Sequence, residues 1–178
     1  FGPLRQLIDH WVGLLEQGVF VPIVSGSDFH RRESNPVANP RNVVLCATPS
    51  VTRDCILSAA REGRLYITND PALSFVVNDA LPGGVVSIAP GAPLRVTVAA
   101  QSQDGGRLDL YLGRTVVERL DLPPGETVRA EWTLAAPPAD SFVRVEVVRH
   151  ERLRHRPDLS LLSNPVRLDV PPARASWR

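Results

Sequence analysis

Residues 142–148 read Phe-Val-Arg-Val-Glu-Val-Val, so that valines alternate with charged side chains. Successive side chains of a β-strand point to opposite faces, which places the alternating valines on one face and Arg144 and Glu146 on the other. Residues 94–100 alternate in the same way. The pattern predicts antiparallel strands, each with one face in a core. The neighbouring sequence can be interpreted outward from these two strands.

The same period of two continues through the chain after residue 70, and no helical stripe interrupts it. Turn-forming runs of Gly and Pro at 104–106, 123–125 and 137–138 separate the apolar segments. The expected strands are 73–78, 94–100, 108–112, 116–120, 128–134, 142–148 and 166–170. We therefore predict an all-β antiparallel sandwich domain over residues 71–178.

The first 70 residues show a different pattern, in which helices alternate with short apolar runs. Residues 3–17 carry leucines at a spacing of three or four, which predicts an amphipathic helix. The apolar run Val19–Ser25 predicts a strand buried on both faces. The remaining expected elements are a strand at 42–47, a helix at 53–62 and a strand at 65–68. We predict an α/β fold for residues 1–70, with too few elements to cover both faces of a parallel sheet.

Composition bounds the function classes. The chain has 178 residues, 20 arginines and no lysine against 19 acidic residues, for a net charge of +1. This balance gives no drive toward nucleic acid. No run of 18 uncharged apolar residues occurs, which predicts a soluble domain without a membrane span or a visible targeting signal. A chain that lacks Met and begins at Phe1 is expected to be part of a longer protein.

The two cysteines, Cys46 and Cys55, lie nine positions apart without zinc or redox spacing. Both occur in apolar runs, which favours a pair of buried thiols. A disulfide between the strand and the following helix is the alternative.

The strongest candidate for chemistry is Ser27-Asp28-Phe29-His30, directly after an apolar run. In an extended backbone Asp28 and His30 point to the same side, so a carboxylate and an imidazole can reach one metal ion. A helix-capping Asp and a surface His would explain the same two residues without a metal.

The string Pro22-Ile-Val-Ser-Gly-Ser-Asp-Phe-His30 resembles the last metal-binding motif of the polymerase and histidinol phosphatase (PHP) superfamily. The order of the segments Ser58–Thr68, Asp70–Asn78 and Leu162–Val166 is similar to the CehA/McbA-like branch, in which a PHP barrel precedes a β-sandwich. The resemblance implies that residues 1–70 are the C-terminal part of a distorted β/α barrel whose N-terminal part is missing from this chain.

The resemblance also implies a function. Asp28 and His30 would bind divalent metal ions (Zn, Mn or Fe) that activate water against a small-molecule ester or phosphoester. The superfamily's His-x-His pair has no counterpart here, because only His10 precedes the motif. Two protein ligands fall short of the usual three of a catalytic zinc site, so we expect this chain alone to be inactive.

Four arginines are candidates for binding the substrate. Arg31, Arg32 and Arg41 flank the Asp-x-His motif and could hold a phosphate, and Arg64 follows the predicted helix. A solvated loop and a structural arginine are the alternatives. The competing hypothesis for the whole chain is a non-catalytic sandwich that serves as a binding or structural module, with a degenerate α/β support.

Overall fold

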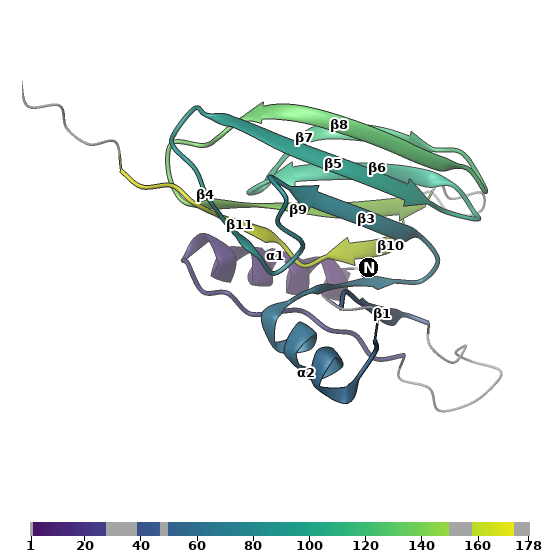
Figure 1. The fold of residues 1–178 in the computed structure, drawn as a ribbon. Helices are drawn as coiled ribbons and strands as arrows, with labels where there is room; N and C mark the ends of the chain where they lie inside the picture. Colours follow the sequence, from purple (N-terminus) through teal and green to yellow (C-terminus); the bar gives the residue numbers. More distant parts are fainter. Residues whose placement is uncertain (1, 28–38, 47–49, 150–157, 173–178) are drawn as a thin grey trace, which may run out of the picture.

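The computed structural model describes residues 2–27, 39–46, 50–149 and 158–172 (Figure 1). The helices are α1 (Gly2–Glu16) and α2 (Arg53–Glu62). The strands are β1 (Arg41–Val44), β2 (Leu65–Thr68), β3 (Ala72–Val77), β4 (Val85–Ser87), β5 (Pro93–Gln101), β6 (Gly106–Leu112), β7 (Thr115–Leu122), β8 (Thr127–Ala135), β9 (Ser141–Arg149), β10 (Asp158–Ser163) and β11 (Val166–Asp169).

Strand β9 is the centre of the larger of two sheets. One edge of β9 pairs with β6, which in turn pairs with β7. The other edge pairs with β10 and then β11, two strands that follow one another closely along it. Beyond them lie β2, which pairs with β10, and β4, which pairs with β11 in parallel. Strand β1 completes the sheet by pairing with β2.

The smaller sheet, β3-β5-β8, packs over this one, and the main core lies between them. The alternation seen in the sequence sends side chains such as Val96, Val98, Leu110, Val143 and Val145 into that core, where each is fully buried. Side chains on the other face of β9 meet α1, which lies below the larger sheet in Figure 1. Strand β9 is therefore buried on both faces, although its sequence predicted only one.

The predicted α/β barrel portion is wrong. Strands β1 and β2 pair antiparallel with each other, and β2 pairs antiparallel with β10, so both extend the sheet of the sandwich. The run Val19–Ser25, expected as a buried strand, joins neither sheet, and Val24 is 61% exposed. An apolar run indicates that a segment prefers burial but does not indicate which strand it pairs with. Strand β2 pairs with β10, which lies far away in the chain, so the local sequence could not predict this pairing.

Both ends of α2 are set by local chemistry. The Thr52 hydroxyl accepts a hydrogen bond from Cys55 N (3.1 Å) at the start of the helix. Gly63 ends it in the left-handed conformation, with φ of 75°.

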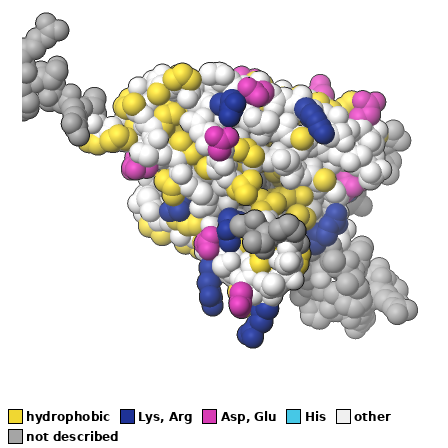
Figure 2. Space-filling model, in the orientation of Figure 1, with side chains coloured by type: hydrophobic (Ala, Val, Ile, Leu, Met, Phe, Trp, Pro, Cys, Tyr) yellow, Lys and Arg dark blue, Asp and Glu magenta, His cyan; other side chains and the backbone are white. Residues whose placement is uncertain are grey.

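In Figure 2 hydrophobic side chains gather near the middle of the viewed face, above α2. Neither helix of the described residues is long and apolar enough to cross a membrane.

Candidate functional site

The segment Val19–Ser27, which leads into Asp28, is held by side chains instead of by a neighbouring strand. Trp11 Nε1 donates to the Val21 carbonyl at 2.8 Å. Ile23 N donates to Asn164 Oδ1 (2.9 Å), and Asn164 Nδ2 donates back to the Ile23 carbonyl (3.0 Å). Ser25 N and Asn42 Oδ1 are 2.9 Å apart, and Asn42 Nδ2 donates to the Ser25 carbonyl at 2.8 Å.

We call Asn42 and Asn164 the asparagine clamps. A primary amide carries one acceptor and two donors, so it can bond both main-chain groups of one residue as a paired strand would. Ile23 and Ser25 are two positions apart, and their main-chain groups therefore face the same side of an extended chain. The clamps fix this chain two and four residues before Ser27, where it enters the predicted metal motif.

Asn164 is the more deeply placed clamp. It lies between β10 and β11, is fully buried, and has a second donor bond from Nδ2 to the Leu65 carbonyl (3.2 Å). Neither clamp was recognised as functional from the sequence. The available signal was an asparagine at 164 between the apolar residues Leu162 and Val166, where a buried amide requires partners.

The predicted metal ligands Asp28 and His30, and the predicted anion-binding Arg31 and Arg32, lie outside the described residues. Within the described ranges no group of three or more His, Cys, Asp or Glu side chains could hold a metal ion. His10 is exposed on α1. The predicted metal site therefore stays a prediction from the sequence.

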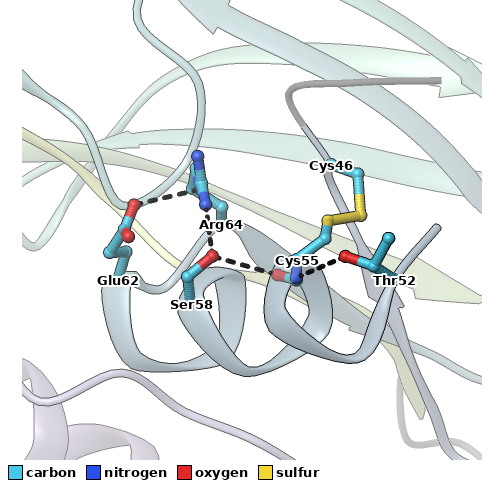
Figure 3. The surroundings of a disulfide bond; sticks show 6 residues. All are labelled: Cys46, Thr52, Cys55, Ser58, Glu62 and Arg64. Atoms are coloured by element: carbon cyan, nitrogen blue, oxygen red, sulfur yellow. Dashed lines mark hydrogen bonds and ion pairs between the residues drawn. A yellow bond between two sulfur atoms is a disulfide. The ribbon is translucent and has the colours of Figure 1, made fainter. Parts of the chain in front are cut away.

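The structure does not bring Arg41 and Arg64 together. Arg41 lies opposite Thr68 in the β1–β2 pair, and Leu45 N bonds to the Arg64 carbonyl at the other end of it. Four residues of strand separate these positions by about 13 Å. Arg41 donates to the Asn69 carbonyl (3.1 Å), and Arg64 meets Glu62 (3.2 Å) and the Ser58 hydroxyl (3.1 Å), as Figure 3 shows for Arg64.

Cys46 and Cys55 form a disulfide. The favoured prediction of two buried thiols is therefore wrong, and the alternative is confirmed. The disulfide joins the end of β1 to the first turn of α2, with the two Cα atoms 5.8 Å apart (Figure 3). That separation lies in the usual range for a disulfide. Both cysteines are therefore structural here and are not metal ligands.

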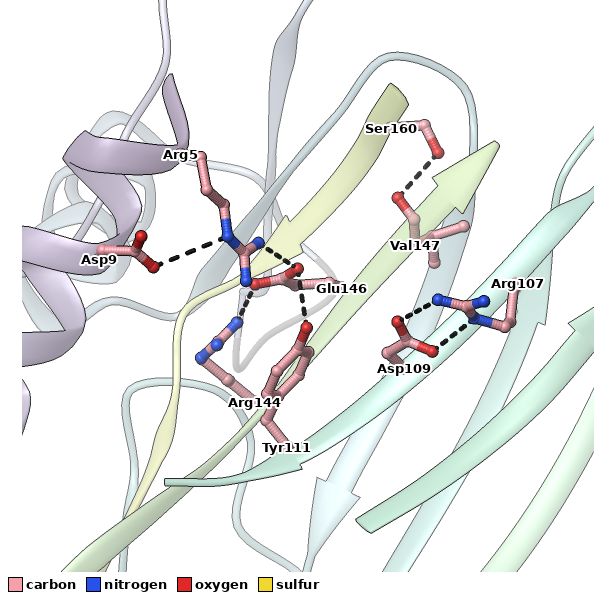
Figure 4. A network of polar contacts seen from close by, with 9 residues as sticks. All are labelled: Arg5, Asp9, Arg107, Asp109, Tyr111, Arg144, Glu146, Val147 and Ser160. Atoms are coloured by element: carbon pink, nitrogen blue, oxygen red, sulfur yellow. Dashed lines mark hydrogen bonds and ion pairs between the residues drawn. The ribbon is translucent and has the colours of Figure 1, made fainter. Parts of the chain in front are cut away.

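A buried polar network lies between α1 and the outer face of the larger sheet (Figure 4). Its centre is Glu146, whose side chain is 2% exposed and meets Arg144, also 2% exposed. Arg5 of α1 donates to the same carboxylate at 2.9 Å, and the Tyr111 hydroxyl donates at 3.3 Å. Arg144 also stacks on the Tyr111 ring, 3.9 Å from its centre. Burial raises the pKa of Tyr111, and the Glu146 charge raises it further.

A second carboxylate on this face, Asp109, is bound by Arg107 at 2.7 Å and 2.9 Å and by Arg119 at 3.4 Å. Positive charge exceeds negative charge in the network, because two arginines surround each of the two carboxylates. The bonds of its members run to one another and, through Arg5, to α1. We assign this network a structural role.

A groove of about 410 Å³ lies beside the C-terminal end of α1. Three of its charged side chains have partners within the fold: Asp140 accepts from Val170 N (2.7 Å), Glu16 pairs with Arg114 (2.8 Å), and Arg167 donates to the Gly83 carbonyl (3.3 Å). Arg167 also stacks on Phe20 at 4.2 Å. The groove is therefore a weaker candidate for a functional site than the segment Val19–Ser27.

Comparison with known protein families matches none of them, and comparison with curated proteins finds no similar sequence.

Proposed function

We propose that this chain contributes Asp28 and His30 to a divalent-metal site that hydrolyses a small-molecule ester or phosphoester. The observation that supports the proposal is the pair of asparagine clamps, which fix the backbone at Ile23 and Ser25, five and three residues before Asp28. Ligands of a metal must be held to within about 0.5 Å of their working positions, which requires a rigid support. The sandwich, through Asn164, is that support.

A bound Zn, Mn or Fe ion would polarise the ester and lower the pKa of a bound water. Asp28 and His30 would bind the ion, and Arg31 and Arg32, the next residues along, would bind a phosphate by charge. The guanidinium groups of Arg41 and Arg64 are occupied by main-chain and side-chain acceptors, so they contribute less to this proposal. A catalytic site needs at least one ligand more than these two, and the similarity to the CehA/McbA-like branch remains part of the proposal.

Metal titration tests the ligand pair directly. Isothermal titration of the chain with Zn²⁺ and Mn²⁺ should show weak binding that Asp28→Ala and His30→Ala each reduce by about tenfold or more. His10→Ala is the matched control, because His10 is exposed on α1, and it should leave the affinity unchanged. The unmodified chain should not hydrolyse bis(p-nitrophenyl) phosphate. Equal affinities for all three variants would contradict the proposal.

The second candidate is a non-catalytic sandwich module. It is favoured by the completeness of the sandwich core and by the lack of a three-ligand cluster in the described ranges. The same titration separates the two candidates, because a purely structural module predicts that Asp28 and His30 make no difference to metal binding.

A further inference from the structure

The clamped segment uses only one side of its backbone. Main-chain groups of Ile23 and Ser25 face the asparagine clamps. In an extended chain the groups of Pro22, Val24 and Gly26 face the opposite side. Within the described residues these groups form no hydrogen bond. Residues 22–26 therefore present an open strand edge, with amide donors at Val24 and Gly26 and carbonyl acceptors at each of the three.

The side chains around this edge are apolar and exposed. Val24 is 61% exposed, and on the adjacent part of α1 Leu4 is 46% and Leu7 67% exposed. Leu4 and Val24 line the same shallow groove of about 210 Å³. Residues 19–27 carry no charge, so two identical segments can approach each other without repulsion. Apolar side chains beside unpaired main-chain groups are the features of a pairing edge.

Two other sheet edges, those of β3 and β7, are protected. On β3, Leu73 N donates to the Tyr66 hydroxyl (3.2 Å) and Val77 N donates to the Ala80 carbonyl (3.0 Å), so its outer amides are largely used. Strand β7 carries the charged residues Glu118, Arg119 and Asp121 along its length. Charged side chains on an edge strand oppose pairing with another chain. The uncharged segment 22–26 lacks both kinds of protection.

We propose that residues 22–26 pair with the same residues of a second copy of this chain, antiparallel about a two-fold axis. With Val24 opposite the partner's Val24, each Val24 N donates to the other's carbonyl, and each Gly26 N donates to the partner's Pro22 carbonyl. Pro22 lacks an amide hydrogen, so in this register the Gly26 carbonyl is the only acceptor that receives no hydrogen bond from the partner. The same contact brings the exposed valines of both copies together.

Analytical ultracentrifugation tests the pairing without reference to the metal site, and it is run in EDTA for that reason. The chain should sediment as a mixture of monomer and dimer that shifts toward dimer between about 5 and 300 µM. Val24→Pro removes the central amide, which has no partner within the fold, and should weaken dimerisation by about tenfold or more. Val24→Thr keeps the amide and should retain the dimer. Val51→Pro, at another exposed valine, should also retain it.

Cross-linking tests the register. Directly opposed residues of a hydrogen-bonded antiparallel pair have Cα atoms about 5.5 Å apart, which suits a disulfide. Val24→Cys should therefore form a covalent dimer under mild oxidation, and Val51→Cys should not. A chain that remains monomeric at all these concentrations, or a dimer that Val24→Pro leaves intact, would overturn the proposal. Unchanged circular dichroism of Val24→Pro confirms that the variant is folded.

Discussion

The sandwich and the N-terminal region, by which we mean α1, the segment Val19–Ser27 and α2, differ in how completely each buries its own apolar side chains. Ten large apolar residues are exposed in the described part of the chain; eight of them precede residue 58, and only Leu81 and Val85 follow it. The buried cluster under α1 is completed by Phe142 and Leu162 of the sandwich. The two sheets, β1 and β2 included, thus share one core, whereas α1 and the segment after it fold by using the outer face of the larger sheet as a support.

The difference shows where the two regions depend on each other. Glu146 binds α1 through Arg5, and Asn164 binds the segment that leads to Asp28. Both are nearly or fully buried residues of the sandwich. Substitutions at these positions, and at matched positions that lack the contact, test the dependence.

The largest effect is expected for Glu146→Ala. It leaves the buried Arg144 without its partner and releases Arg5, which should lower the free energy of unfolding by about 3–5 kcal/mol. Urea denaturation followed by circular dichroism measures the change. Glu131→Ala, on the exposed side of β8, is the control and should stay within about 0.5 kcal/mol of the unmodified chain. A loss below about 1 kcal/mol at Glu146 would show that the network is not needed for stability.

A leucine from each region tests the contrast in burial. Leu110 is fully buried between the sheets, and its replacement by Ala should cost about 2–5 kcal/mol. Leu7 is 67% exposed on α1, and Leu7→Ala should change the stability by no more than about 0.5 kcal/mol. The same urea titration compares them. Similar losses at both positions would mean that the N-terminal region has a core of its own.

Asn164→Ala should have a smaller global effect and a clear local one. It removes the bonds to Ile23 and Leu65 and should cost about 2 kcal/mol. Hydrogen exchange at Ile23 should accelerate, while exchange at Val145 in the centre of β9 should change only as far as global stability does. Asn42→Ala, at the exposed clamp, should accelerate exchange at Ser25 with a smaller cost. Unchanged protection at Ile23 in Asn164→Ala would rule out the clamp.

The smallest effect concerns pH. Burial, assisted by Glu146, raises the pKa of Tyr111 above its ordinary value of about 10. The folded state keeps this proton to a higher pH than the unfolded chain does, so the associated stability is complete below about pH 10 and is lost as the pH rises through the folded value. Urea titrations from pH 8 upward should show a steeper decline in the unmodified chain than in Tyr111→Phe. Parallel declines would argue against this titration.

Much of the sandwich could be predicted from sequence, because the period of two along 94–100 and 142–148 records which side chains face the core. The same period predicted one apolar face for β9 and could not predict that Arg144 and Glu146 are buried. Their cover, α1, is more than 120 residues distant in the chain, and Arg5 neutralises Glu146 only in the folded state. A local pattern carries no information about such a partner.

The N-terminal region was less predictable for a related reason. The apolar run Val19–Ser25 predicted a buried strand, yet its main-chain groups bond to side chains, among them the amides of Asn42 and Asn164, more than 15 and 130 residues away. Nothing in the local sequence marks an asparagine as a substitute for a strand. The roles of Asp28 and His30 remain predictions from the sequence, since these residues lie outside the described ranges.

The buried clamp is also protected chemically by its neighbour. An asparagine loses its amide mainly when the backbone nitrogen of the next residue attacks the side-chain carbonyl, and the residue after Asn164 is Pro165, whose nitrogen carries no hydrogen. Loss of that amide would leave a carboxylate, which cannot donate hydrogen bonds to the Ile23 and Leu65 carbonyls that now accept from Nδ2. The proline after the clamp therefore protects the chain before Asp28 from a slow form of damage.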